Sequence, residues 1–92
     1  MKFEWDEEKN NANIKKHKIS FEKAIQVFLD PMHLEIPDPY EAEDRWNAIG
    51  FAGSILFVVY TERKEDTIRI ISARKAEKEE INGYKNGYFG RS

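Results

Sequence analysis

The N-terminal third of the chain changes from the period of a strand to that of a helix. Alternation of aromatic and charged residues over 2–5 predicts a short edge strand. Asp6 then caps a predicted helix whose first turn is acidic. Ala12 and Ile14 are its apolar positions, and we expect it to extend to about residue 17. Two secondary-structure elements therefore precede residue 20.

Ser20 begins a second predicted helix, with Lys23 where a complete capping box would have Glu. Apolar residues follow at the i, i+3, i+4 and i+7 spacing of an amphipathic helix, namely Phe21, Ala24, Ile25 and Phe28. The dipeptide Asp30-Pro31 ends this helix, because the residue before proline avoids the helical region.

The C-terminal half predicts a sheet and one more helix. A brief strand at 33–36 and a polar loop come first. Strands are then predicted over 45–51 by alternation, over 55–61 by the most hydrophobic run of the chain, and over 67–74 by its β-branched residues. Short turns join these three strands, which favours an antiparallel meander. A helix is expected over about 75–84, followed by a Gly-rich flexible tail, 85–92. The predicted fold is α+β: two N-terminal helices packed on a small antiparallel sheet, with a C-terminal helix, in a single domain of residues 1–84.

The predicted strand 67–74 contains two arginines, Arg69 and Arg74, whose charged side chains the sheet must accommodate. Strict alternation places Arg69 and Arg74 on opposite faces, unless a bulge or the strand end reorients Arg74. If the helices cover one face, the other is open to solvent or to a ligand. Each arginine could equally lie over apolar neighbours with its charge in water, or pair with a carboxylate.

The amino-acid composition excludes several classes of functional site. The chain of 92 residues has no cysteine, which excludes disulfides, thiolate zinc sites and a cysteine nucleophile. The two histidines, 16 positions apart, predict no metal site, and no Gly-rich phosphate loop occurs. No apolar run reaches the length of a membrane span and the N-terminus does not resemble a signal peptide, so we expect a cytoplasmic protein.

The net charge of −2 conceals an asymmetry. Residues 1–44 hold 6 Lys and Arg against 11 Asp and Glu, a balance of −5. Residues 45–92 hold 9 against 6, a balance of +3, and contain all five arginines. The net charge therefore gives no support for nucleic-acid binding. A local basic surface that binds an anion is still possible, and so is a charged face that serves only solubility.

Four segments together resemble one family: FEWDEEKNNANIKKHKISFEKA, EDRWNAIG, VVYTER and IRIISARKA, in that order. They are similar to the BrnT toxins of bacterial type II toxin–antitoxin modules, over about residues 3–84. The resemblance implies a RelE-like fold and a ribonuclease that inhibits translation. It also implies neutralisation by a ribbon-helix-helix antitoxin (BrnA-like) in a heterotetramer that represses its own operon. Lys18 stands where relatives often carry a helix-ending glycine, which puts the shape of that corner in question.

Metal-free RNA cleavage needs a base for the 2′ proton, an acid for the leaving oxygen and cations for the phosphorane. Arginine suits the last task because its planar fork matches two phosphate oxygens. Arg74 is the first candidate and Arg69 the second, and Glu62 or His17 would be the base. Possible acids or positioning groups are Lys9, Tyr60 and Tyr84. The residues expected to contact RNA are Arg45, Arg63, Lys9, Tyr60 and Lys75. No cofactor is expected.

Each candidate also has a simpler explanation. His17 at a helix end can serve the helix dipole, Glu62 and Arg63 can form a surface ion pair, and Lys9 can solvate an exposed face. Two other functions remain open at this stage. One is a degenerate toxin that only binds its antitoxin as a co-repressor, and the other an unrelated α+β module that binds an anionic ligand.

Overall fold

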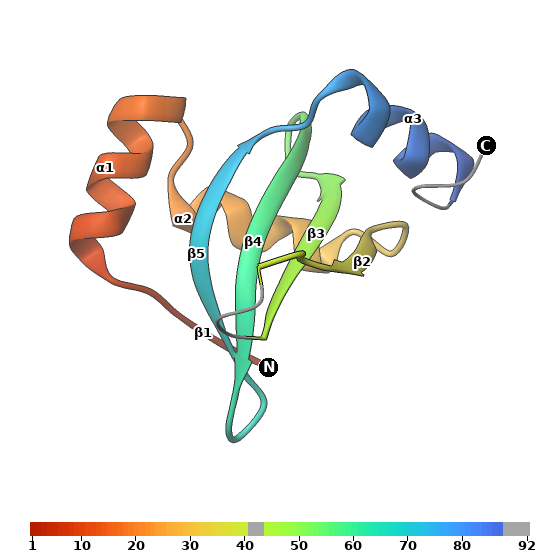
Figure 1. Ribbon diagram of the computed structural model, residues 1–92. Helices are drawn as coiled ribbons and strands as arrows, with labels where there is room; N and C mark the ends of the chain where they lie inside the picture. Colours follow the sequence, from red (N-terminus) through yellow and green to blue (C-terminus); the bar gives the residue numbers. More distant parts are fainter. Residues whose placement is uncertain (41–43, 88–92) are drawn as a thin grey trace.

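The computed structural model describes residues 1–40 and 44–87. Five strands lie in the order β1-β5-β4-β3-β2, with α1 beside β5 and α2 behind the sheet (Figure 1). The elements are β1 Lys2–Glu4, α1 Glu7–His17, α2 Phe21–Ala24, the 3₁₀-helix η1 Ile25–Leu29, β2 Leu34–Pro37, β3 Arg45–Phe51, β4 Ile55–Arg63, β5 Thr67–Lys75 and α3 Lys78–Asn86. In the described part of the chain, no helix is long and apolar enough to cross a membrane.

The predicted α+β class and the β3–β4–β5 meander are confirmed, and β2 adds an antiparallel strand beside β3. The sheet is nevertheless mixed, because β1 runs parallel to β5, with Lys2 opposite Thr67 and Glu4 opposite Arg69. The expectation of a purely antiparallel sheet was therefore wrong. A parallel pair needs a long crossover, and α1 and the rest of the chain supply it here.

Helix α1 begins where its cap predicts, because Asp6 Oδ1 accepts hydrogen bonds from the amides of Glu8 (2.8 Å) and Lys9 (3.3 Å). Its buried side is unexpected. Ala12 and Ile14 are exposed, and the side chains buried against the protein are two asparagines, Asn10 and Asn13. The helix therefore docks through hydrogen bonds rather than through an apolar stripe.

Asn13 completes the edge of strand β5. Its Nδ2 donates to the Ala73 carbonyl (2.8 Å) and its Oδ1 accepts from the Ala73 amide (3.1 Å). The same Nδ2 also donates to the Ile19 carbonyl at 2.8 Å. Since β1 pairs with β5 only over residues 67–69, the backbone of Ala73 would otherwise lie buried without a partner. The carboxamide of Asn13 thus acts as one residue of an adjacent strand.

The turn between α1 and α2 is also fixed by specific hydrogen bonds. Lys18 adopts the left-handed conformation (φ 62°) and donates its amide to the Ile14 carbonyl (2.8 Å). The position that relatives often give to glycine therefore keeps a glycine-like backbone. Asn10 Oδ1 accepts the Phe21 amide at 2.8 Å, and Ser20 caps α2 through the Lys23 amide at 3.0 Å.

The core lies between these N-terminal helices and one side of the sheet, here called the inner face. The predicted stripe of the second helix packs there, although the helix tightens to 3₁₀ geometry after Ala24. Fully buried core side chains come from both layers: Phe21, Val27, Leu56, Val58, Tyr60 and Ile70. The opposite side of the sheet is called the outer face.

Helix α3 lies beside the end of β3 (Figure 1) and contacts that strand, and Glu80 of α3 binds Arg74 at this end of the outer face. Beneath it Ile49 is fully buried, although it points away from the inner core. The helix begins at Lys78, three residues later than predicted, because β5 continues to Lys75. It ends at Asn86, two residues into the expected tail, and Gly87 (φ 79°) provides its left-handed cap. Residues 88–92 of that tail lie outside the described residues.

We predict that Asn13→Ala destabilises the fold by about 2–4 kcal/mol, because it leaves two buried backbone groups of Ala73 without partners. Urea unfolding followed by circular dichroism measures this loss. Asn11→Ala, at an exposed position of the same helix, should change stability by about 0.5 kcal/mol or less. Equal stability of the two variants would show that the amide of Asn13 does not hold the β5 edge.

Candidate functional site

An irregularity in β5 changes which residues share a face. Val59 of β4 pairs with Ser72, but its next residue, Tyr60, pairs with Ile70. Ile71 is therefore an extra residue on β5, a β-bulge. Bulges re-aim the side chains that follow them and are enriched next to active sites. The alternation along β5 must consequently be counted separately before and after Ile71.

The bulge places the two arginines of β5 on the same face. Ile68 and Ile70 point to the inner core, and the next core residue is Ala73, three positions on instead of two. Arg69 and Arg74 therefore both lie on the outer face, although strict alternation predicts opposite faces. The sequence left open that a bulge could reorient Arg74, and the bulge at Ile71 has this effect.

Arg69 belongs to a row that crosses the sheet. Arg45 of β3 lies opposite Thr61 of β4, and Thr61 lies opposite Arg69 of β5. We call Arg45, Thr61 and Arg69 the arginine row. Glu4 of β1 continues it, and its Oε2 accepts a hydrogen bond from Arg69 Nη1 at 3.1 Å. These two side chains are 43% and 35% exposed, so solvent screens the pair.

Thr61 is the unusual member of the row. The residue is 8% exposed, and its hydroxyl has no hydrogen-bond partner among the described residues. A buried hydroxyl without a partner costs about 1–3 kcal/mol, so a polar atom bound at this position would recover that cost. Beside it, the Arg45 guanidinium carbon lies 4.1 Å from the centre of the Tyr40 ring. A depression of about 670 Å³ adjoins the row, lined by Pro37, Asp38, Tyr40, Asp44, Arg45, Trp46 and Glu62.

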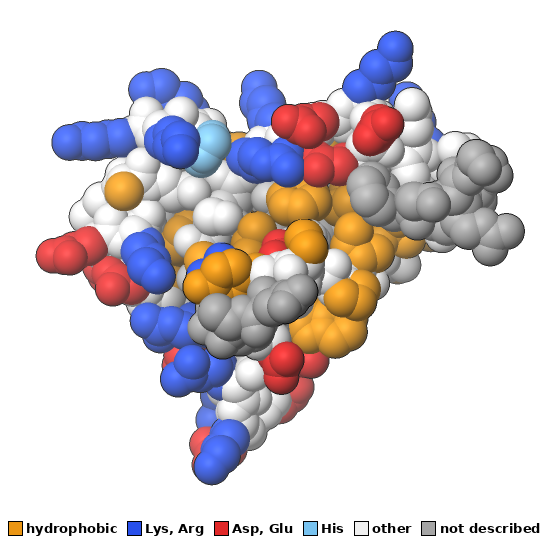
Figure 2. Space-filling model, viewed as in Figure 1, with side chains coloured by type: hydrophobic (Ala, Val, Ile, Leu, Met, Phe, Trp, Pro, Cys, Tyr) orange, Lys and Arg blue, Asp and Glu red, His pale blue; other side chains and the backbone are white. Residues whose placement is uncertain are grey.

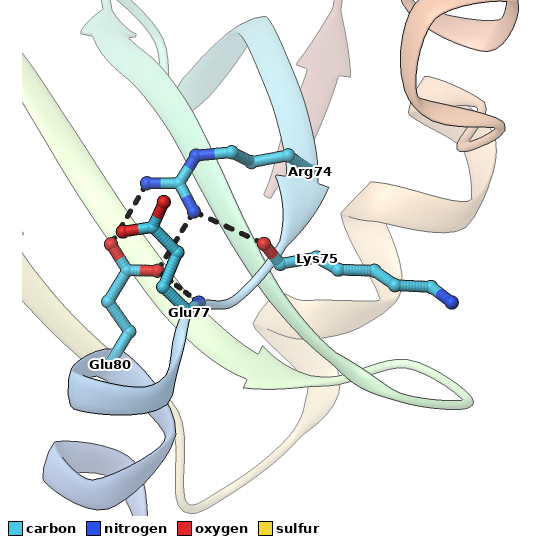
Figure 3. Close-up of polar contacts among 4 residues, drawn as sticks. All are labelled: Arg74, Lys75, Glu77 and Glu80. Atoms are coloured by element: carbon cyan, nitrogen blue, oxygen red, sulfur yellow. Dashed lines mark hydrogen bonds and ion pairs between the residues drawn. The ribbon is translucent and has the colours of Figure 1, made fainter.

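Arg74 lies at the other end of the outer face, and three of the five N–H groups of its guanidinium form hydrogen bonds there (Figure 3). Its Nη1 and Nη2 donate to the two carboxylate oxygens of Glu80, both at 2.9 Å, and Nη1 also donates to the Lys75 carbonyl at 3.1 Å. The guanidinium carbon stands 4.1 Å above the ring of Phe57. The hydrogen bonds to Glu80 raise the pKa of Arg74; burial opposes the charge of Glu80, but its pKa is lowered by Arg74 and the Glu77 amide. The first candidate of the sequence analysis thus fastens α3 to the sheet.

The far end of α3 is fastened by Tyr84. Its hydroxyl donates to Asp30 Oδ2 at 2.6 Å, and the Asp30 carboxylate also accepts the amides of Met32 (2.9 Å) and Phe51 (2.8 Å). The hydrogen bond to Asp30 raises the pKa of Tyr84. Tyr84 therefore serves the attachment of α3, at the opposite end of this helix from Arg74.

The other predicted residues do not converge on one place. Glu62 and Arg63 are exposed at the end of β4 near the arginine row, and Lys9 is exposed on α1. His17 is half-buried in the last turn of α1, and Lys75 is exposed at the opposite end of β5 from Arg69. Tyr60 is only 1% exposed on the inner face, where burial raises its pKa. A core side chain of this kind offers no surface to RNA, which corrects its assignment as a contact.

Sequence reasoning missed the acidic partners of both arginines. The capping-box spacing of Glu77 and Glu80 was a usable signal for Glu80, because the structure shows both reciprocal hydrogen bonds of that motif. Glu4 gave no signal, since its neighbour depends on a parallel pairing between residues 65 positions apart. In the described part of the chain, no group of three His, Asp or Glu side chains is arranged to hold a metal ion.

His33, which had no predicted role, belongs to a small polar cluster. Its Nε2 lies 2.7 Å from Glu35 Oε2 and its Nδ1 lies 2.7 Å from the Asp30 carbonyl oxygen. Burial alone would lower the pKa of His33, but the hydrogen bonds to Glu35 and Asp30 raise it above 6.5. The ring also packs edge-on against Phe28, with the two ring centres 5.8 Å apart.

Comparisons with known proteins show the family to which the chain belongs. The model of a family described as the ribonuclease toxin, BrnT, of type II toxin–antitoxin systems matches residues 5–80. The chain belongs to the BrnT family. Among solved structures, the crystal structure of the Brucella abortus ribonuclease toxin BrnT is 31% identical in sequence, with a TM-score of 0.66. The match covers 85% of this chain and 99% of that one. No curated protein matches the chain.

Membership of the BrnT family indicates the general function of the protein. A BrnT protein is a ribonuclease toxin of a type II toxin–antitoxin system, so an antitoxin partner is implied. The resemblance inferred from the four sequence segments is confirmed, and so is the three-helix α+β fold expected from it. In this chain Arg45 and Arg69 lie at one end of the outer face, and Arg74, which is bound to Glu80 of α3, lies at the other.

We predict that Arg74→Ala and Glu80→Gln each destabilise this BrnT protein by about 1–3 kcal/mol, since each leaves a charged partner unpaired. The double variant should lose less than the sum, and urea unfolding of all four proteins measures that coupling. Glu79→Gln, an exposed neighbour in the same helical turn, is the control. Additive losses would show that the pair does not hold α3.

We predict that His33 makes stability depend on pH. Because its folded pKa is raised, its contribution is fully present below about pH 6.5 and is lost as pH rises through the folded pKa. Melting temperatures of the wild type and of His33→Gln, measured from pH 5.5 to about 8.5, should therefore converge at the alkaline end. A constant difference across this range would contradict an ionised His33 facing Glu35 and Asp30.

Proposed function

We propose that this BrnT protein cleaves RNA without a metal ion, at the arginine row. The 2′ oxygen attacks the neighbouring phosphorus, the bond from phosphorus to the 5′ oxygen breaks, and a 2′,3′-cyclic phosphate and a 5′-hydroxyl result. A base takes the 2′ proton and an acid supplies one to the leaving oxygen. The observation that carries the proposal is the row itself, in which two guanidinium groups flank a buried hydroxyl that has no hydrogen-bond partner within residues 1–40 and 44–87.

Arg69 and Arg45 are the residues that we assign to the phosphate. Arg69 is now paired only with Glu4, in an ion pair screened by solvent, and exchanging that carboxylate for a phosphate costs little. Tyr40, stacked on Arg45 and 48% exposed, offers a ring on which a base can stack. Arg74 is assigned a positioning role instead, because its donors are engaged by Glu80 and the Lys75 carbonyl.

Glu62 is the proposed general base. It lines the same depression as Arg45, whereas His17 lies in the last turn of α1 with no described contact to the row. Neither tyrosine suits the role of the acid. Burial raises the pKa of Tyr60 and the hydrogen bond to Asp30 raises that of Tyr84, so both phenols are poorer proton donors than an exposed tyrosine.

The test is cleavage of a defined RNA by the purified protein in EDTA. We predict that the wild type cuts and that Arg69→Ala loses about 10²–10³-fold in rate, the usual cost of one preorganised charge partner. Native melting curves must accompany each variant. Glu4→Gln, which releases Arg69, should retain activity, and Lys85→Ala on α3 is the control for a lost surface charge.

Two results would contradict the proposal in different ways. Cleavage that requires added Mg²⁺ would refute metal independence but keep the ribonuclease. Full activity of a folded Arg69→Ala variant would remove the arginine row from the reaction. A test of Arg74→Ala against Glu80→Gln then shows whether Arg74 acts through α3, because loss in both variants indicates positioning.

The antitoxin is proposed to carry a ribbon-helix-helix DNA-binding domain. In that arrangement the toxin and antitoxin form a heterotetramer in the cytoplasm, and the antitoxin contacts the operator DNA. Family membership supports an antitoxin, and the sequence resemblance supports its class. Co-expressed partners that elute as two separate species in size-exclusion chromatography would argue against this complex.

A binding-only toxin is the alternative, and the Arg74–Glu80 pair favours it. An arginine whose Nη1 and Nη2 are both engaged by one carboxylate serves as a structural clamp and does not offer that bidentate edge to a phosphate. In this alternative the protein binds its antitoxin and supports repression without cutting RNA or inhibiting translation. The absence of growth arrest on expression, together with no cleavage in either EDTA or Mg²⁺, would favour this alternative.

A further inference from the structure

A second basic feature lies at the opposite end of the strands from the arginine row. It is a depression of about 380 Å³ between the α1–α2 corner, the β3–β4 turn and the end of β5. Three lysines from three separate elements line it, Lys18, Lys23 and Lys75, above an apolar floor that includes Ala52 and Leu56. We call this feature the lysine pocket. Figure 2 shows further Lys and Arg side chains gathered over the last turn of α1.

The charges of the lysine pocket are not compensated within the described structure. No described ion pair involves Lys18, Lys23 or Lys75, whereas Arg69 and Arg74 each have a carboxylate partner. The side chain of Lys75 extends away from Glu77 and Glu80 (Figure 3). Three like charges around one depression repel one another and favour an anion between them.

The backbone makes room for one of these ammonium groups. Gly53 in the β3–β4 turn has φ +82°, and a Cβ added there would lie 2.7 Å from Lys23 Nζ. A side chain at residue 53 would therefore be strained and would also displace Lys23. The hydroxyl-bearing residues Ser20 and Ser54 also line the pocket and add potential donors to a bound oxyanion.

We propose that the lysine pocket binds a phosphate of the RNA strand at a distance from the cleaved bond. This assignment rests on the proposed function in taking RNA as the ligand. The pocket has no aromatic ring on which a base could stack, so it contacts the backbone alone and is indifferent to sequence. An RNA bound at both features passes from the outer face over the end of the sheet that the start of β4 and the end of β5 form.

The two features are separated by most of the length of β4 and lie on opposite sides of the sheet, since Leu56 faces the inner core and Thr61 lies on the outer face. Leu56 and Thr61 are five residues apart on that strand, roughly 17 Å at about 3.3 Å per residue, and a bound RNA must in addition pass over the end of the sheet. At about 3.4 Å per nucleotide for a stacked strand, bridging them takes more than about five nucleotides. A dinucleotide therefore reaches the arginine row alone, and an RNA of about ten nucleotides reaches both features.

The experiment measures binding of uncleavable 2′-O-methyl RNA to the wild type, Lys23→Gln, Lys75→Gln and the double variant. For the RNA of about ten nucleotides, each substitution should weaken binding equally for all sequences and lower the salt slope by about 1. Binding of the dinucleotide should not change. Lys85→Gln on α3 removes an exposed charge away from both the pocket and the arginine row and is the matched control.

Three outcomes would overturn the proposal. The first is equal binding of the longer RNA by the wild type and a folded double variant. The second is a response of the Ser54 amide signal to inorganic phosphate alone, with unchanged RNA affinity in the variants, which would indicate a site for free phosphate. The third is loss of antitoxin binding with RNA binding intact, which would assign the pocket to an acidic protein segment. Wild-type protein that binds but does not cut RNA would refute only the proposed cleavage.

Discussion

The hydrogen bonds between Asn13 and the backbone of Ala73 are the constraint on which the outer face depends. Ala73 is the first core residue after the bulge at Ile71, and its inward orientation decides that Arg74 points outward. Asn13 holds that backbone in place where β1 no longer covers the edge of β5. A helix that docks through apolar contacts would tolerate a slip by one residue, whereas a paired carboxamide does not.

The outer face consequently has two unlike ends. At one end Arg74, Phe57 and Glu80 form a packed and hydrogen-bonded junction that holds the start of α3. At the other end Arg69 keeps a screened partner and lies beside a hydroxyl that lacks one. The first end therefore holds the contacts that stabilise the fold, and the second holds the groups that can still bind a ligand. This division is what a binding surface on a small domain requires, since a site must remain able to exchange its partners.

Much of the fold could be predicted from the sequence, because strands and helices follow from local periodicity and caps. Strand β3 has the predicted bounds, and the caps at Asp6 and Ser20 occur as expected. The failures share a physical origin in long-range pairing. The parallel position of β1, the bulge at Ile71 and the partners of Arg69 and Arg74 all depend on which segments meet. The burial of Asn13 runs against residue-type expectation, since asparagine is mostly exposed.

The parallel pairing of β1 has a consequence for how the molecule is made. Glu4 and Arg69 are 65 residues apart and Asn13 and Ala73 are 60 apart, so both contacts close very large loops. Such contacts form late, because their entropic cost must be met before they stabilise anything. During synthesis, β1 and α1 cannot pack against the sheet until β5 has left the ribosome. The arginine row is therefore assembled only when nearly all of the described chain has been translated, and a truncated product lacks it.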